Sequence, residues 1–178
     1  MQSLHARGSM LVLKQIVVAI DFTEVSDAAF DYAVDLAARL GARLTVVHTY
    51  ELPILGLSDG MVIAAADTSF RVAEAARAGL AAAVQAREGR GVELTAVLRE
   101  GVAWDEINIV ADEVDADLIV IGTHGRKGLA RALLGSIAEH VIRAATRPVL
   151  TIHAPHHPTT ARAAPHAERS QASGHGRS

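Results

Sequence analysis

The chain has 178 residues, a net charge of −3 and no cysteine, and 50% of its residues are apolar. This length suits one domain with a sizeable core. The small, scattered charge argues against a nucleic-acid surface, the lack of cysteine excludes disulfides and thiolate metal sites, and no apolar run approaches the roughly 20 residues that span a membrane. We therefore expect a cytoplasmic protein that binds neither nucleic acid nor membrane.

The first part of the chain predicts two strands separated by a helix. Apolar, β-branched runs at Gln15 to Asp21 and Arg43 to Thr49 are typical of strands buried on both faces of a parallel sheet. We expect Ser26 to cap the helix between them and Gly41 to end it in the left-handed conformation. The predicted buried face of this helix consists of Ala29, Phe30, Ala33, Val34, Ala37 and Leu40.

The middle of the chain is less regular. The stretch from Tyr50 to Ala66 contains proline and several glycines, which predicts irregular structure. A helix is expected from about Thr68 to Glu88, locally weakened by Gly79, and a third strand from Val92 to Leu98. A further helix is predicted from about Ala103 to Val114.

The last elements complete an alternation of strands and helices. They are a strand at Asp117 to Ile121, a helix at Ser136 to Ile142 with Ser136 as its cap, and a strand at Pro148 to His153. This alternation predicts an α/β fold, a five-stranded parallel sheet with helices on both faces. With right-handed crossovers and the strand order 3-2-1-4-5, a topological switch point lies between the first and fourth strands, where ligands bind.

The two ends of the chain lack such patterns. We expect residues 1–12 to be a flexible leader, residues 13–153 to be the domain, and residues 154–178 to be a disordered tail. The tail contains four histidines, so metal binding remains open as an alternative to solvated disorder. These histidines are His156, His157, His166 and His175.

The most informative segment is GTHGRKGLARALLGS, which joins the fourth strand to the following helix. Glycines let the backbone approach a bulky anion, and a helix start presents unpaired N–H groups and the positive end of the helix dipole. This arrangement is typical of a phosphate site. The alternative is that the glycines only build a surface loop and that Ser136 only caps a helix.

The glycine spacing resembles the nucleotide-binding signature of the universal stress protein family: Gly122, two residues, Gly125, nine residues, then Gly135 and Ser136. The resemblance covers nearly all of Leu13 to His153. It implies an adenine nucleotide alpha hydrolase-like fold and an ATP-binding regulatory module in the stress response. It also implies Mg²⁺ or Mn²⁺ on the phosphates and a homodimer formed along Val149–Ile152.

The resemblance also implies a set of binding residues. Asp21 would lie against the nucleoside, Ala19 and Ile20 would form an apolar floor, and Thr49 would offer backbone groups to adenine. The positions matching the phosphate and ribose contacts are Gly122, His124, Gly125, Gly135, Ser136, Ile137 and Ala138. Two alternatives stay open: that Asp21 serves only to tie down the loop at residues 22–25, and that His124 serves only to hold the loop shape.

No catalytic arrangement is visible in the sequence. There are no paired carboxylates beside the glycine loop and no Ser/His/Asp set. Two other functions therefore remain as alternatives, a nucleotide-free dimeric interaction module and a slow ATPase. We expect His48 to be a satisfied core histidine, and Trp104 to pack the third helix against the sheet.

Overall fold

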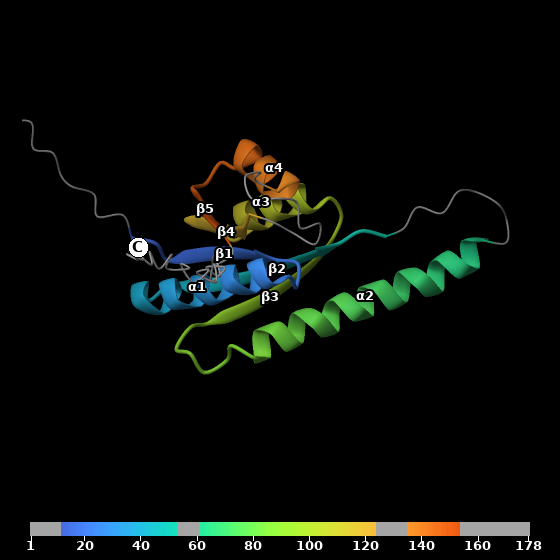
Figure 1. Ribbon diagram of the computed structural model, residues 1–178, viewed down its shortest axis with the longest axis horizontal. Coiled ribbons are helices and arrows are strands. Elements are labelled where there is room, and N and C mark those ends of the chain that lie inside the picture. The colour runs from blue at the N-terminus through green and yellow to red at the C-terminus, as the bar shows by residue number, and fades with distance from the viewer. Residues whose placement is uncertain (1–11, 53–60, 124–134, 154–178) are drawn as a thin grey trace, which may run out of the picture.

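A computed structural model describes residues 12–52, 61–123 and 135–153. Within these ranges the chain forms a parallel five-stranded sheet in the order β3-β2-β1-β4-β5 (Figure 1), which confirms the predicted fold class and strand order. The strands are β1 (Gln15–Ile20), β2 (Arg43–Tyr50), β3 (Leu94–Glu100), β4 (Leu118–Gly122) and β5 (Val149–Ile152). The sheet reverses its order between β1 and β4, so a switch point lies where the sequence predicted one.

Helices cover both faces of the sheet (Figure 1). On one face lie α1 (Glu24–Leu40) and α2 (Met61–Gln85), and on the other lie α3 (Ala103–Glu113) and α4 (Ser136–Ala144). The alternating side chains of β1 divide between two aliphatic cores, since Ile16, Val18 and Ile20 pack under α1 while Val17 and Ala19 pack under α3 and α4. Every residue of β1 is buried, as expected for a central parallel strand.

Asp117 links the amino-terminal ends of β1 and β4 by hydrogen bonds. One of its carboxylate oxygens accepts the backbone N–H of Lys14 at 2.7 Å and that of Gln15 at 3.0 Å, which joins the start of β1 to the start of β4. These two hydrogen bonds hold the pKa of Asp117 below its ordinary value of 3.8, with a smaller contribution from the charges of Arg147 and Lys14.

Replacing Asp117 by asparagine is expected to lower the free energy of unfolding at about pH 7 by ~1–2 kcal/mol, because an amide oxygen is a weaker acceptor than a carboxylate. Because folding lowers the pKa of Asp117, its contribution is present above the unfolded value and is lost as pH falls through the folded one. Urea unfolding should therefore separate variant and wild type near neutral pH, and the difference should shrink as the pH falls below the unfolded pKa of Asp117 and through its lowered folded pKa. An equal separation at neutral and at acidic pH would contradict this.

Helix α1 begins with a capping box. Thr23 is its N-cap, and its hydroxyl accepts the N–H of Ser26 at 3.3 Å while the Ser26 hydroxyl accepts the N–H of Thr23 at 3.1 Å. The prediction that Ser26 is the cap is therefore wrong, because Ser26 is the reciprocal partner three residues into the motif. At the other end Gly41 has φ +65°, which confirms the predicted left-handed termination.

Helix α2 and strand β3 differ from the predicted bounds. The irregular stretch predicted from Tyr50 to Ala66 is wrong at both ends, because Tyr50 belongs to β2 and α2 already begins at Met61. The three alanines at 64–66 favour helix, so the helix includes this part of the stretch. The helix ends at Gln85 and is followed by a turn with Gly89 and Gly91 at positive φ, and β3 begins at Leu94, two residues later than predicted.

Contacts between α1 and the chain after α2 are largely ionic. The Arg87 guanidinium lies 4.3 Å from the centre of the Phe30 ring and pairs with Asp27 at 3.3 Å and Asp31 at 3.0 Å. Its side chain is only 11% exposed, so its stem covers the aromatic core beneath it. Arg90 continues the row by pairing with Asp31 and with Asp35 one turn further along α1.

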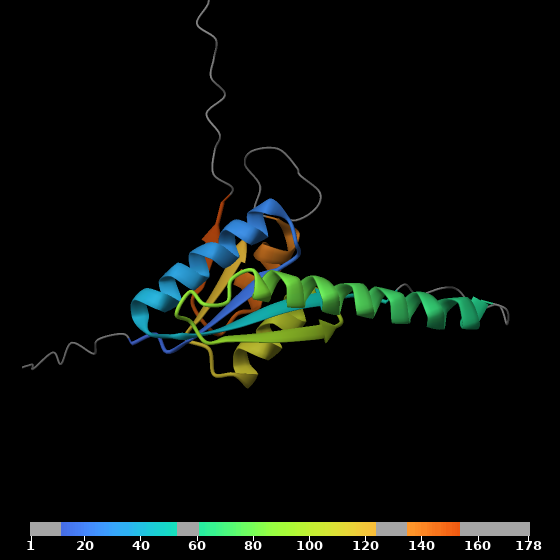
Figure 2. The ribbon, with the colours of Figure 1, turned by 90° about the horizontal axis from the view of Figure 1, so that it is seen from below.

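Part of α2 extends past the sheet. Figures 1 and 2 show its amino-terminal portion projecting away from the strands, whereas its carboxyl-terminal portion lies over β2 and β3. Phe70 in the projecting portion is 67% exposed, while Ala76 and Leu80 further along are buried. None of the helices in the described part of the chain is both long and apolar enough to cross a membrane.

Candidate functional site

The carboxyl ends of β1 and β4 meet at the switch point. Parallel pairing aligns Ala19 with Ile121, so the residues that follow both strands leave the sheet side by side. Gly122 packs against the start of α1, where an added Cβ would lie 3.1 Å from Cγ1 of Val25 and 3.3 Å from its backbone. Close packing therefore favours glycine at position 122, apart from any contact with a ligand.

Asp21 opens the turn between β1 and α1. Its Oδ1 accepts the backbone N–H of Thr23 at 3.1 Å and the Thr23 hydroxyl at 2.6 Å, while its own N–H donates to Ser26 Oγ at 3.2 Å. Asp21 does tie down the loop, as one of the two sequence interpretations expected. This role fixes the backbone of Asp21 at the switch point, beside the end of β4.

Thr123 joins the two ends of the glycine loop. It is fully buried, its carbonyl accepts the N–H of Gly135 at 2.5 Å, and its N–H donates to the carbonyl of Ile152 at 2.9 Å. Its hydroxyl lies 3.0 Å from Nδ1 of His153, at the end of β5. The residue before α4 is thereby held against the end of β4, and both are tied to β5.

Helix α4 starts without a side-chain cap. Gly135 is its N-cap and Ser136 its first helical residue, so the predicted capping role of Ser136 is wrong. The amides of Ser136, Ile137 and Ala138 lie in the first turn, where no helical carbonyl can accept them. Ser136 and Ile137 are exposed, whereas Ala138 is buried. These amides and the positive end of the helix dipole form an anion-attracting surface next to Gly122 and Thr123.

The remaining predicted residues lie on the strands. Ala19 and Ile20 are 7% and 5% exposed, and their side chains pack into the cores on opposite faces of the sheet. Thr49 lies near the end of β2, half-buried and aligned with Arg99 of β3.

His48 and Trp104, which we expected to have structural roles only, both contact neighbouring elements of the fold. Buried His48 donates Nδ1–H to the carbonyl of Ile20 at 2.8 Å, which confirms the satisfied core histidine. Trp104 of α3 packs against the core under α3 and α4 and also stacks on His140 of α4 at 5.9 Å, an interhelical contact that the sequence did not predict.

Several predictions lie outside the described residues. They concern His124 and Gly125 in the loop, the leader at residues 1–11, and the tail with its four histidines. The described part of the predicted site consists of Ala19, Ile20, Asp21, Thr49, Gly122, Gly135, Ser136, Ile137 and Ala138. Of these, Asp21, Gly122 and Gly135 lie together at the carboxyl edge of the sheet, where β1 and β4 end and α4 begins. Thr49 lies one strand away, on β2.

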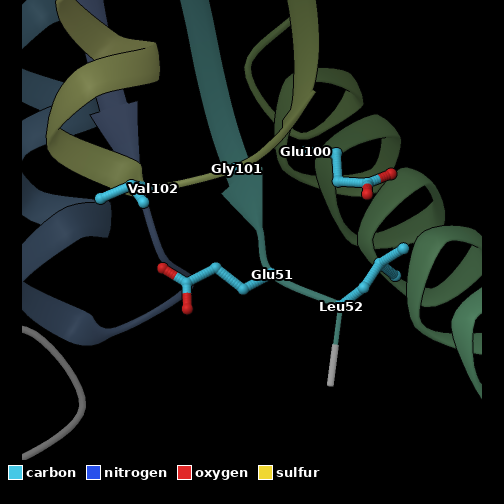
Figure 3. A pocket seen from close by; sticks show the side chains of 5 residues that line it. All are labelled: Glu51, Leu52, Glu100, Gly101 and Val102. Carbon is cyan, nitrogen blue, oxygen red and sulfur yellow. The ribbon is translucent and has the colours of Figure 1, made fainter. Parts of the chain in front are cut away.

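A hollow of about 320 Å³ opens at the same edge, beyond Thr49. Glu51, Leu52, Glu100, Gly101 and Val102 line it, and Figure 3 shows Glu100 directed toward α2 while Glu51 is directed away from it. Gly101 donates its N–H to the carbonyl of Tyr50 at 3.0 Å, which joins the ends of β2 and β3. The Tyr50 hydroxyl donates to Glu100, and burial together with the Glu100 carboxylate raises the pKa of Tyr50.

Sequence reasoning missed three residues at this edge: Thr123, His153 and Phe22. Thr123 lies inside the glycine signature, so its position was a usable signal. His153 gave none, because only the parallel register of Gly122 with Ile152 brings it beside Thr123. Phe22 has φ +62°, a conformation that the sequence of a bulky aromatic residue does not suggest.

A parallel sheet with a switch point, flanked by two helices on each face, defines a doubly wound α/β domain. The family model described as the universal stress protein family matches residues 13–153, and the chain belongs to this family. A universal stress protein of Methanocaldococcus jannaschii is 34% identical over 155 residues, which cover 84% of this chain and 87% of that protein.

Solved structures of the family share the fold. The universal stress protein UspA from Lactobacillus plantarum superposes with a TM-score of 0.70 at 23% identity, covering 79% of this chain and 97% of that one. A universal stress protein in complex with cAMP has a TM-score of 0.56 at 26% identity, covering 80% and 98%. One from Archaeoglobus fulgidus in complex with dAMP has a TM-score of 0.55 at 29% identity, covering 79% and 98%.

Proposed function

We propose that this chain is an ATP-binding regulatory module of the stress response, with the nucleotide at the carboxyl edge of the sheet. The observation that carries the proposal is the uncapped start of α4, held by the hydrogen bond from Gly135 to Thr123 beside the end of β4. A phosphate group satisfies such amides and is stabilised by the helix dipole. The complexes of two family members with cAMP and dAMP support an adenine nucleotide as the ligand.

The nucleoside end of the ligand would lie toward β1 and β2. Asp21 offers a carboxylate at the end of β1, and Thr49 lies near the end of the neighbouring strand. Carboxylate oxygens accept hydrogen bonds from ribose hydroxyls or from an adenine amino group. The proposal therefore assigns the phosphates to Gly135, Ser136, Ile137 and Ala138, with His124 and Gly125 of the loop, and the nucleoside to Asp21, Ala19, Ile20 and Thr49.

A divalent cation would be held by the phosphates. In the described ranges, no group of three or more histidine, aspartate or glutamate side chains is placed to hold a metal ion. The proposal accordingly places Mg²⁺ or Mn²⁺ on the phosphate oxygens. It also includes a cytoplasmic location, which suits an ATP-dependent chain without cysteine.

The test is to purify the protein, release its bound small molecules by heat and separate them by chromatography. ATP or ADP in amounts comparable to the protein, together with saturable binding of added ATP after the retained nucleotide is removed, is the expected result. No retained nucleotide and no binding of added ATP would favour the nucleotide-free interaction module. Phosphate release on addition of ATP and Mg²⁺ would instead favour the slow ATPase.

The proposal includes a homodimer formed along β5. This strand pairs with β4 on one side, and its four residues are half-buried. A short parallel edge with unpaired backbone groups is stabilised when a second chain pairs with it. A second copy would add its own β5 to Val149–Ile152.

Val149→Lys is expected to shift the protein from dimer toward monomer, because a lysine on an edge strand opposes pairing with another chain. Light scattering gives the mass directly. Thr95→Lys is the matched control, since it adds the same charge to β3, the opposite edge of the sheet, where Thr95 is exposed. A mass that is unchanged by Val149→Lys, or lowered equally by Thr95→Lys, would count against this interface.

A further inference from the structure

We propose that Phe22 positions Asp21 for the nucleotide and that it couples this residue to helix α2 through Gly79. The inference rests on the proposed function, because it takes the nucleotide to bind beside Asp21. Phe22 is therefore a positioning residue, which acts through its neighbour in the chain. Three features of Phe22 carry the inference. Its backbone is in the left-handed conformation, its ring packs on His48, and the tip of its ring packs on Gly79.

The backbone of Phe22 is in an unfavourable conformation. Its φ of +62° lies in the left-handed region, where a bulky side chain is rarely found. Hydrogen bonds on each side hold it there, since the Asp21 N–H donates to Ser26 Oγ and the Thr23 N–H donates to Asp21 Oδ1. Strained conformations of this kind persist only where the surrounding structure enforces them, and they concentrate at functional sites.

The ring of Phe22 is packed against a fixed partner. Its centroid lies 4.2 Å from that of His48, at an interplanar angle of 43°. His48 is buried and is bound through Nδ1–H to the carbonyl of Ile20, the last residue of β1. The ring therefore rests on a residue that is itself tied to the strand leading into Asp21.

The tip of the same ring meets α2 at a glycine. A Cβ added to Gly79 would lie 3.0 Å from Cζ of Phe22 and 3.1 Å from Cε2, closer than side chains normally approach. A glycine inside a helix is unfavourable compared with alanine, so its presence here is explained by this close contact. Any shift of α2 toward the sheet must move the Phe22 ring, and a shift away releases it.

This packing links the nucleotide site to α2 in both directions. If the position of α2 changes the affinity for ATP through Phe22, bound ATP must change the stability of α2 by the same factor. The linked portion is the carboxyl-terminal half of the helix, which lies over β2 and β3 (Figure 2) and continues into the projecting half. Binding of the nucleotide would thus change the stability of α2, a helix that does not contact the nucleotide.

The first test moves the glycine by one position. The double variant Ala78→Gly/Gly79→Ala keeps one glycine in α2, so its effect on helix stability is balanced, but it places a methyl group against Phe22. ATP affinity, measured by calorimetry, is expected to fall about 10-fold, or ~1.4 kcal/mol. Ala78→Gly alone is the control, because Ala78 is exposed, and it should bind ATP as the wild type does.

The second test measures the reverse effect by hydrogen exchange. In the wild type, saturating ATP should slow exchange of the amides at residues 76–85 by several fold. Phe22→Gly keeps the left-handed turn without strain but removes the ring, so ATP should no longer alter exchange there. A role limited to stability would change exchange equally with and without ATP.

The outcomes separate the coupling from the function on which it rests. If the wild type binds ATP but the shifted-glycine variant binds equally well, or if ATP leaves exchange in α2 unchanged, the coupling is wrong and the nucleotide site stands. If the wild type binds no ATP in calorimetry, the proposed function is wrong and the coupling falls with it.

Discussion

Gly135→Val is expected to abolish ATP binding while leaving the helical content of the protein intact. Gly135 has φ −58° and ψ 146°, which valine adopts without strain, so the fold should persist. A side chain at the N-cap lies over the second and third amides of the helix. The valine methyl groups would therefore cover the amides of Ile137 and Ala138 and exclude a phosphate oxygen. We expect ATP to bind at least about 100-fold more weakly, or ~2.7 kcal/mol, in calorimetry.

Two further variants at this helix start sharpen the result. Gly135→Asp should cap α4 and raise the unfolding midpoint slightly, yet repel phosphate, so stability and affinity would move in opposite directions. Ser136→Ala, which removes only a hydroxyl, should weaken binding far less. Undiminished ATP affinity in both Gly135 variants would show that the phosphates do not lie at the start of α4.

Phe30→Ala is expected to cause the largest loss of stability, about 3–5 kcal/mol, because it leaves a cavity in the core under α1. Phe30 is fully buried and also supports the Arg87 guanidinium 4.3 Å above its ring. Loss of the ring therefore removes apolar burial and the support of a cation that holds Asp27 and Asp31. Small domains are stable by only about 5–15 kcal/mol, so we expect a loss of this size to leave a measurable fraction of the variant unfolded at growth temperature.

Urea unfolding of Tyr32→Ala provides the matched comparison. Tyr32 lies two residues away on the same helix but is 48% exposed, so its removal should cost at most about 1 kcal/mol. Phe30→Leu keeps most of the buried volume and should fall between the two. A loss in Phe30→Ala no larger than that in Tyr32→Ala would mean that the core under α1 does not depend on this ring.

The sheet could be predicted because its strands carry continuous apolar runs. Ile16 to Ile20 and Leu118 to Ile121 contain hardly any polar side chain, which indicates strands buried on both faces. Because helices are predicted between these strands and crossover connections are right-handed, only a few strand orders of a parallel sheet remain. Gly41 was also predictable, since a helix that ends in the left-handed conformation strongly favours glycine.

Element ends were predicted less well because several signals compete there. Thr23 and Ser26 both have hydroxyls that can cap α1, and only the geometry shows that they bind each other reciprocally. Ser136 has a hydroxyl at the right place in the sequence, but the helix begins with it instead of after it. The predicted start of α2 at about Thr68 has the capping-type residues Asp67 and Thr68, but the helix begins earlier, at Met61, because the alanines at 64–66 favour helix.

The convergence of Asp21 with Gly122 was predictable from the strand order alone. The contacts that fix them were not, because they depend on register and on close packing between elements distant in sequence. His153 reaches Thr123 only through the pairing of β4 with β5, and Phe22 reaches Gly79 only through the placement of α2 over β2 and β3. Neither contact has a periodic signature in the chain.

The hydrogen bond between Thr123 and Gly135 makes the structure of the sheet independent of the length of the loop between them. Because the loop's two ends are already joined, and Thr123 is anchored to Ile152, lengthening the chain between them costs only the slowly growing entropy of loop closure. The sequence between residues 124 and 134 can therefore change in length or composition without disturbing the strands, and on the proposed function such changes would alter ligand preference. On the same proposal, family members with this scaffold would differ in ligand through this one segment.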